Sequence, residues 1–364
     1  MSQWNTDWEG VHGFNDTAAE LTTAFHPGGR EAGARHFDKL SRWDDWLGLT
    51  REGYRTGTTL VLVLPFYKAW GLTDAKMREY ALSHLLIIPG AIETLAYVNR
   101  MMPIFVVSTT YSICMVPIVE MAGVPKQNLY CTQISLDRYQ FSPAEIRQIE
   151  RLTQEIAELP KMDWPRKAAT DADLSPKMRE VNRRLNQIFW REDGELMEME
   201  AWRQMIGEIK VTGGPGKAEA IQDSCRRTGN TLAQTAFADD SITGVQGLEL
   251  VRQSGGLAIS VNGNRYAVKA AEIVCLLDNA LPLAVLLTAF SQGEREAVMN
   301  LVQKWSWKAV ASLGLDMALI EQLHRAYPDN LPQVEIVTEA NLDRLTGESE
   351  AGRVRIRGEV GKLG

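Results

Sequence analysis

The middle and later parts of the chain contain short apolar runs that alternate with helical segments. Residues 102–108 (MPIFVVS) are apolar and partly β-branched, which predicts a strand, and residues 111–123 follow with a helical pattern. The segments 239–254 and 262–271 predict helical crossovers between further strands. Strands that alternate with helices are typical of a parallel sheet, so we predict an α/β fold with a Rossmann-like parallel sheet core. Those further strands are predicted by three apolar runs: 232–238, 256–261 and 272–277.

The first part of the chain has a mostly helical pattern between residues 13 and 85. Thr17 and Glu20 have the spacing of a capping box, in which each side chain satisfies a free backbone N–H group at a helix start. Residues 58–72 are apolar on all sides, which fits a buried helix and a strand equally well. We expect residues 13–85 to form a helical cap that is inserted into the core.

A second polar, helix-rich segment extends from residue 126 to residue 204. Ser142 and Ser175 each precede a proline in this segment, an order that is typical of a helix start. We expect residues 126–204 to form a second insertion. Residues 291–364 are expected to form a helical C-terminal extension whose charged tail, from residue 347 onward, is extended or mobile. These predictions leave three segments for the α/β core: 1–12, 86–125 and 205–290.

The composition is that of an ordinary globular protein. Of the 364 residues, 45% are hydrophobic and 23% are charged, and the net charge of -7 argues against a surface that binds nucleic acid. The amino-terminal residues lack the basic, apolar and cleavable order of a signal peptide. The longest apolar run, residues 104–123, is interrupted by hydroxyl residues and Pro117. The sequence therefore predicts a cytoplasmic protein that binds neither nucleic acid nor a membrane, and it leaves homo-oligomerisation open.

Polar and charged side chains gather at the ends of the predicted strands, which meet at one crevice in a parallel sheet. Carboxylates that meet there repel one another, and Mg²⁺ removes the repulsion while it leaves room for a phosphate oxygen. Hydroxyl groups and a lysine neutralise a phosphoryl group, and a carboxylate can attack its phosphorus atom. The residues concerned are two acidic pairs, a hydroxyl pair and a lysine: Asp7 and Glu9, Asp239 and Asp240, Ser108 and Thr109, and Lys217.

The order of these residues resembles the four motifs of the haloacid dehalogenase (HAD) superfamily, and within it the phosphoserine-phosphatase-like branch. The segment DWEG is similar to the first motif, and this resemblance makes Asp7 the nucleophile and Glu9 the general acid and base. The segment VVST is similar to the second motif, which assigns phosphate binding to Ser108, with Thr109 beside it. More closely, the whole chain is similar to uncharacterised hydrolase-like proteins known as energy-converting hydrogenase subunit R, a label that names no activity.

The third and fourth motifs supply the lysine and the remaining acids. The segment GGPGKAEAI is similar to the third motif, and the resemblance implies that Lys217 holds the nucleophile and the phosphate together. The segment ADDSITGVQ is similar to the fourth motif, in which Asp240 binds the metal and Asp239 lies beside it. The resemblance thus implies Mg²⁺ as the cofactor, with ligands drawn from Asp7, Glu9, Asp239 and Asp240.

The function implied by these motifs is Mg²⁺-dependent hydrolysis of a small phosphorylated substrate, a phosphate monoester, through an aspartyl phosphate on Asp7. A second interpretation is a protein of the same fold that has lost turnover and serves as a binding or assembly partner. Three features favour it: Gly244 stands where the fourth motif usually has a second acid, Glu9 is one methylene longer than the usual aspartate, and residues 1–5 are polar for a central strand. A third interpretation is phosphonate or carbon–halogen cleavage on the same core.

Overall fold

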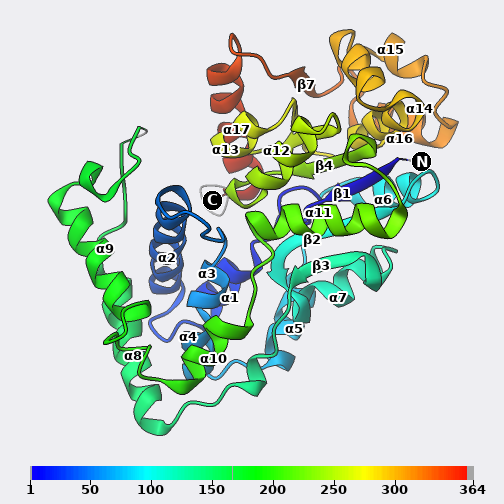
Figure 1. Cartoon of the computed structure of the whole chain (residues 1–364). Coiled ribbons are helices and arrows are strands. Elements are labelled where there is room, and N and C mark those ends of the chain that lie inside the picture. Colours follow the sequence, from blue (N-terminus) through cyan, green and yellow to red (C-terminus); the bar gives the residue numbers. More distant parts are fainter. Residues whose placement is uncertain (1, 166, 359–364) are drawn as a thin grey trace.

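A seven-stranded sheet forms the centre of the computed structural model, which describes residues 2–165 and 167–358 (Figure 1). The strand order is β3-β2-β1-β4-β5-β6-β7. The first six strands are parallel to their neighbours, and β7 is antiparallel to β6 at one edge. This arrangement confirms the predicted α/β fold with a Rossmann-like core. The strands are β1 (Gln3–Thr6), β2 (Ile104–Tyr111), β3 (Leu129–Thr132), β4 (Thr235–Asp239), β5 (Leu257–Val261), β6 (Ile273–Leu276) and β7 (Gln333–Ile336).

Helices cover both faces of this sheet (Figure 1). Because alternate strand residues point to opposite faces, Val106 and Ile259 pack with α6, α7 and α14, whereas Val107 and Phe237 pack with α11, α12 and α13. Helices α15 and α16 lie against α14, and α17 lies against α13. These helices are α6 (Ala91–Asn99), α7 (Ser112–Met121), α11 (Pro215–Thr228), α12 (Val245–Gln253), α13 (Arg265–Ala270), α14 (Leu281–Gln303), α15 (Trp307–Ala311), α16 (Met317–Ala326) and α17 (Leu342–Arg357).

Strand β1 is polar, yet it lies at the centre of the sheet between β2 and β4, and all of its residues are buried. Nε2 of Gln3 and Nδ2 of Asn5 both donate to Oγ of Ser224, each at 2.8 Å. Oε1 of Gln3 accepts hydrogen bonds from Thr228 and Asn230. The polar strand can be buried because α11 and the turn after it supply hydrogen-bond partners for its side chains.

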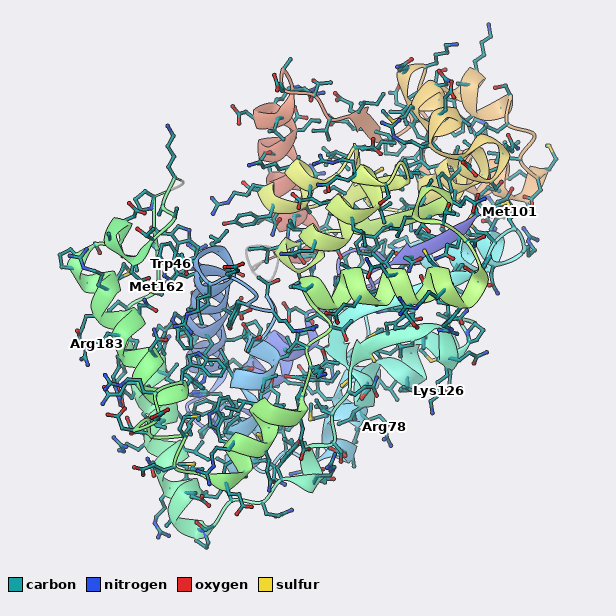
Figure 2. The ribbon with its side chains drawn as sticks, viewed as in Figure 1. Trp46, Arg78, Met101, Lys126, Met162 and Arg183 are labelled. Atoms are coloured by element: carbon teal, nitrogen blue, oxygen red, sulfur yellow. The ribbon has the colours of Figure 1, made fainter. Side chains whose placement is uncertain are left out.

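The two predicted insertions form one helical body beside the sheet (Figure 1). Their buried side chains share a single hydrophobic core, in which Trp43 from the first insertion packs on Phe189 from the second. Figure 2 shows Trp46 and Met162 at this junction, where Nε1 of Trp46 donates to Oδ1 of Asp171 at 2.9 Å. The helices are α1 (Thr17–Phe25), α2 (Arg30–Thr50), α3 (Thr59–Leu62), α4 (Leu64–Ala69) and α5 (Asp74–Ser83) in the first insertion, and α8 (Pro143–Glu158), α9 (Pro176–Phe189) and α10 (Glu200–Glu208) in the second.

The apolar segment 58–72, which fits a helix or a strand by its pattern, contains the helices α3 and α4. Their side chains lie in the core of the helical body, so burial on all sides accounts for the lack of a polar face. Short 3₁₀ helices complete the secondary structure: η1 (Lys126–Asn128), η2 (Leu136–Arg138), η3 (Asp171–Asp173), η4 (Leu232–Gln234) and η5 (Ile242–Gly244).

All three predicted helix starts are present, and two of the three have the expected N-cap. Ser142 and Ser175 cap α8 and α9 as predicted, each by accepting a backbone N–H hydrogen bond with its hydroxyl oxygen. Helix α1 begins at Thr17, but its N-cap is Asp16, which accepts a hydrogen bond from the backbone N–H of Ala19. Thr17 instead contacts Glu9: the backbone N–H and the hydroxyl group of Thr17 both donate to the Glu9 carboxylate.

The C-terminal part of the chain departs furthest from the sequence-based expectation. The prediction of an extended tail is wrong for residues 347–357, which belong to α17, and residues 359–364 of the predicted tail lie outside the described residues. The sheet also includes β3 and β7, which come from the segments 126–204 and 291–364 outside the predicted core. Within the described parts of the chain, no helix is both long and apolar enough to cross a membrane.

Candidate functional site

The predicted site residues meet at the carboxyl ends of the central strands. Asp7 directly follows β1, and its backbone N–H donates to the carbonyl oxygen of Ala238 in β4 at 2.9 Å. Asp239 ends β4 and Asp240 follows it, so both acids lie beside Asp7. The strand order reverses between β1 and β4, and crevices at such positions hold ligands in sheets of this kind.

Lys217 connects the two strands at their ends. It lies in the first turn of α11, and its Nζ atom is 2.5 Å from Oδ2 of Asp7 and 2.6 Å from Oδ2 of Asp239. Burial alone would lower the pKa of Lys217, but Asp239 and Asp7 raise it above its ordinary value. Burial raises the pKa of Asp7 to about 7, against the lowering effect of Lys217. Lys217 therefore stays protonated and favours the ionised form of its neighbours.

Asp7, Asp239 and Asp240 form a buried acid trio, in which each residue offers one carboxylate oxygen within 4.8 Å of the others. A set of carboxylate oxygens alone suits Mg²⁺, which prefers oxygen ligands. Oδ1 of Asp240 accepts no hydrogen bond from the described residues, and it is therefore available to a cation. Glu9, the fourth acid that the motifs suggest as a metal ligand, lies outside this trio.

Two arginines that the sequence analysis missed contact the trio from the C-terminal helix. Arg353 and Arg357 of α17 both donate to Oδ2 of Asp240, the second at 2.9 Å. Their side chains are only 4% and 5% exposed. Their spacing of four residues places them on one face of a helix. The helical spacing of the two arginines is not evident from the sequence, because arginine and apolar residues alternate in RVRIR, a pattern that is typical of a strand.

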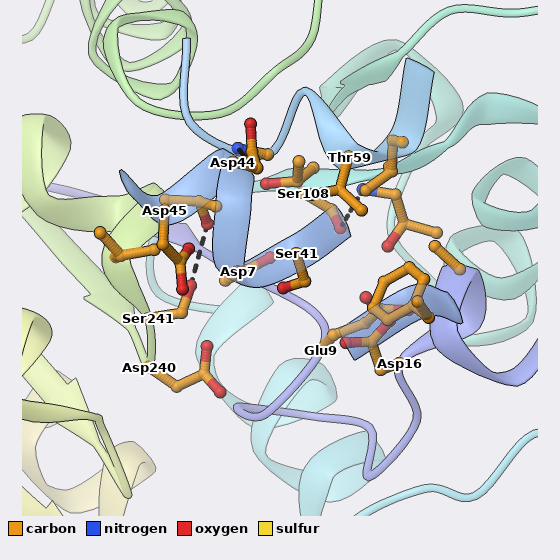
Figure 3. Close-up of a pocket in the computed structure, with 18 of the residues that line it drawn as sticks. Asp7, Glu9, Asp16, Ser41, Asp44, Asp45, Thr59, Ser108, Asp240 and Ser241 are labelled. Carbon is orange, nitrogen blue, oxygen red and sulfur yellow. Dashed lines mark hydrogen bonds between the residues drawn. The ribbon is translucent and has the colours of Figure 1, made fainter. Parts of the chain in front are cut away.

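A pocket opens between the acid trio and the helical body (Figure 3). Asp7, Ser108 and Thr109 line it from the sheet, while Asp44 and Asp45 of α2 line it from the helical body. Oγ1 of Thr109 is buried and has no hydrogen-bond partner within the described chain. The hydroxyl group of Ser108 accepts from the backbone N–H of Thr110, so its proton remains free to donate. The predicted hydroxyl pair is therefore in place to bind an anionic oxygen, whereas Lys217 does not line the pocket.

Glu9 lines the same pocket and is held by the start of α1. Its Oε1 atom accepts hydrogen bonds from the backbone N–H of Thr17 at 2.8 Å and from its hydroxyl group at 2.6 Å. Burial, with a smaller contribution from Asp16, raises the pKa of Glu9 to about 8. A carboxyl group with such a pKa carries a proton at neutral pH, which is the state that a general acid needs.

Gly244 has no side chain, and the carboxylate of Asp239 occupies the space that a side chain at this position would need. A Cβ atom at position 244 would lie 2.1 Å from Cγ of Asp239 and 2.3 and 2.4 Å from its carboxylate oxygens. The acid that the fourth motif usually carries at position 244 is thus excluded by the acid at position 239. Oδ1 of Asp239 accepts from the backbone N–H groups of Asp240 and Ser241, and these bonds fix the carboxylate in this space.

We expect Gly244→Ala to force the Asp239 carboxylate away from Lys217. Overpacking of a tight site destabilises proteins by about 1–3 kcal/mol, so urea unfolding should show a loss of this size. Gly207→Ala is the matched control, because nothing lies within 4 Å of a Cβ atom at that position. Equal stability of Gly244→Ala and the unsubstituted protein would contradict the tight packing of Asp239 on Gly244.

His12 lies under the loop that carries Asp7 and Glu9. Its ring is buried, with Nε2 2.9 Å from Oγ1 of Thr6. Burial lowers the pKa of His12 to about 3, well below the value of about 6.5 in an unfolded chain. Between these two pH values His12 binds a proton in the unfolded chain but not in the folded protein, so this residue favours unfolding in acid.

The contribution of His12 to the free energy of unfolding should therefore decrease as the pH falls below about 6.5, by up to about 1.4 kcal/mol per pH unit, whereas Asp7 and Glu9, whose pKa values are raised, contribute in the opposite direction. Urea unfolding, measured from pH 7 to pH 5, should show that the stability of His12→Gln relative to that of the unsubstituted protein increases as the pH falls. His84→Gln, at an exposed position, is the control and should leave the pH dependence unchanged. An unchanged slope in His12→Gln would show that His12 is not the group that takes up the proton.

Comparisons with protein-family models and with curated proteins find no match to this chain. Among solved structures, that of gene product AF1437 from Archaeoglobus fulgidus has a TM-score of 0.79 and 25% sequence identity, and the match covers 100% of this chain and 99% of that chain. A crystal structure of phosphoserine phosphatase in apo form has a TM-score of 0.45 and 14% identity over 78% of this chain and 96% of that chain. A phospho-aspartyl intermediate analogue of phosphoserine phosphatase has a TM-score of 0.44 and 14% identity over 75% and 92%. These similarities give no support to a hydrogenase subunit.

Proposed function

We propose that the protein hydrolyses a small phosphate monoester in a Mg²⁺-dependent reaction, through an aspartyl phosphate on Asp7. The observation that carries this proposal is the convergence of Asp7, Lys217 and Asp240, which are far apart in the chain, at the carboxyl ends of β1 and β4. The order of the four motifs, which resembles that of the HAD superfamily, also supports it. Asp7 both contacts Lys217 and lines the pocket, as a nucleophile must.

In the first step an oxygen of Asp7 attacks phosphorus, and the bond from phosphorus to the ester oxygen breaks. Glu9 donates its proton to the leaving oxygen, and it then accepts a proton from the water that hydrolyses the aspartyl phosphate. The hydroxyl groups of Ser108 and Thr109 hold the phosphoryl oxygens, and Lys217 favours the ionised form of Asp7. Mg²⁺, when bound by Asp7, Asp240 and Asp239, supplies charge neutralisation for the phosphoryl group.

A panel of small phosphate monoesters tests this proposal. Release of inorganic phosphate should require Mg²⁺ and should stop in EDTA. Rapid acid quenching during turnover should trap a phosphoryl group on the peptide that contains Asp7, which mass spectrometry detects. Phosphate release that is unaffected by EDTA, or a phosphoryl label on another residue, would contradict the proposed mechanism.

A second candidate function, an anion-binding protein without turnover, is favoured by one observation. Oδ2 of Asp240 is already paired with Arg353 and Arg357, so the acid that should hold the metal has two cations beside it. This candidate predicts that inorganic phosphate binds in isothermal titration calorimetry, whereas none of the monoesters is hydrolysed with Mg²⁺. Halide release without metal from a haloacid would instead favour carbon–halogen cleavage.

A further inference from the structure

The arginine pair of α17, Arg353 and Arg357, lies against Asp240 through several hydrogen bonds. Arg353 donates to Oδ2 of Asp240 and also to its carbonyl oxygen, the latter at 2.7 Å. Arg357 donates to Oδ2 of Asp240 at 2.9 Å and to the carbonyl oxygens of Phe14 and Asn15 at 3.0 and 2.7 Å. These contacts tie the C-terminal helix to both the fourth-motif loop and the loop after β1.

The charges in contact with the acid trio balance it without a metal ion. Asp7 and Asp239 are paired with Lys217, and Asp240 is paired with the arginine pair. Three buried carboxylates thus face three buried cations. Burial of charged groups is tolerated when each has a partner, so this pairing allows the site to fold with no divalent cation present. The other acids that line the pocket lie outside the trio: Glu9, Asp16, Asp44 and Asp45.

A divalent cation that entered this balanced group alone would add two positive charges next to two guanidinium groups, and the three carboxylates of the trio are already paired. Repulsion between like charges is strong in a buried site, because little solvent screens it. A phosphoryl group brings about two negative charges, so a cation and a phosphoryl group that enter together leave the site balanced. Oδ1 of Asp240 remains available to the cation, since among the described residues the hydrogen bonds from the arginine pair to this carboxylate go to Oδ2.

We propose that the arginine pair serves as the counter-ion of Asp240 in the free protein, so that a divalent cation binds tightly only together with a phosphoryl group. Both arginines also line the pocket, and the role proposed for them here is that of positioning residues, which act through Asp240. The inference rests on the proposed function in one respect, which is that the acid trio is the metal site.

Titration of the full chain with Mn²⁺, followed by the loss of the free Mn²⁺ signal in electron paramagnetic resonance, tests this proposal. In the unsubstituted protein, saturating inorganic phosphate should tighten Mn²⁺ binding by at least about 10-fold, and Mn²⁺ should tighten phosphate binding by the same factor, as linkage requires. Arg353→Met/Arg357→Met should bind Mn²⁺ alone at least about 10-fold more tightly than the unsubstituted protein and should lose most of the coupling to phosphate.

Two further variants keep the test decisive. Arg355→Met removes an exposed arginine from the same helix and should behave as the unsubstituted protein. Arg357→Met alone leaves Arg353 in place, and it should shift Mn²⁺ affinity in the same direction as the double variant by a smaller factor, even where the double variant folds poorly. A circular-dichroism melt shows which variants are folded at the temperature of the titration.

The outcomes separate this inference from the proposed function. Weaker Mn²⁺ binding in the arginine variants would show that the arginines only hold Asp240 in a metal-binding orientation, and it would overturn the inference while the metal site stands. Mn²⁺ binding of equal strength with and without phosphate would also overturn it. Absence of Mn²⁺ binding in every folded protein, with and without phosphate, would overturn the metal-dependent function, and the inference with it.

Discussion

Replacement of Asp7 by asparagine is expected to lower kcat by at least about 10³-fold, since an amide cannot attack phosphorus as a carboxylate does. The substitution keeps the size of the side chain, and Oδ1 can still accept the hydrogen bond from the backbone N–H of Trp8. Steady-state phosphate release with the best monoester of the panel, together with the acid-quench label, measures the effect. Both turnover and the label should be lost together.

Asp329→Asn is the control for this experiment, because Asp329 is an exposed acid far along the chain from the site motifs. Its turnover should equal that of the unsubstituted protein. An Asp7→Asn variant that remained folded and retained more than about a tenth of the activity would rule out Asp7 as the nucleophile. The pocket would then require another nucleophile or direct attack by water.

Lys217→Met is expected to have the largest effect on stability. The substitution removes the cation that Asp7 and Asp239 share, so two buried carboxylates lose their partner. Breaking a buried ion pair in this way lowers the free energy of unfolding by about 3–5 kcal/mol. Lys210→Met, at an exposed position just before α11, should change the free energy of unfolding little. Urea unfolding of both variants at pH 7.5 makes the comparison.

The pH dependence of Lys217→Met provides a second measurement. Burial already raises the pKa of Asp7, and loss of the lowering effect of Lys217 should raise it further. A carboxyl group whose pKa is higher in the folded protein than in the unfolded chain stabilises the fold as the pH falls towards its unfolded value. The stability deficit of Lys217→Met should therefore shrink between pH 7.5 and pH 5. A deficit that stays constant over this range would show that the lost energy comes from packing and not from unpaired charge.

The parallel sheet could be predicted because its strands are local features. The β-branched runs that became β2, β5 and β6 are largely apolar on both faces, as is usual for strands between two helical layers. The position of the site could be predicted from the strands, because functional residues in such sheets lie beyond the carboxyl ends of the strands. Asp7, Lys217 and Asp240 do meet there.

What could not be predicted depends on contacts between distant segments. The polar strand β1 can be buried because Ser224 and Thr228 of α11 form hydrogen bonds with its side chains. No local sequence pattern reveals these hydrogen bonds. The alternation in RVRIR favours a strand, yet the helix forms because Leu345 of α17 packs against Val268 and Val274 of the core. The arginine pair was missed for this reason.

The common core of the two insertions limits how the pocket can be exposed to solvent. Trp43 and Phe189, from different insertions, are packed together, so neither insertion can swing outward without opening an apolar interior to water. Any movement of the helical body that widens the pocket would therefore carry both insertions together, about their connections to the sheet. The connections 12–16, 84–90, 133–141 and 209–214 would act as the hinges, and changes in their stiffness should alter the rates of substrate entry and product release more than the chemical step.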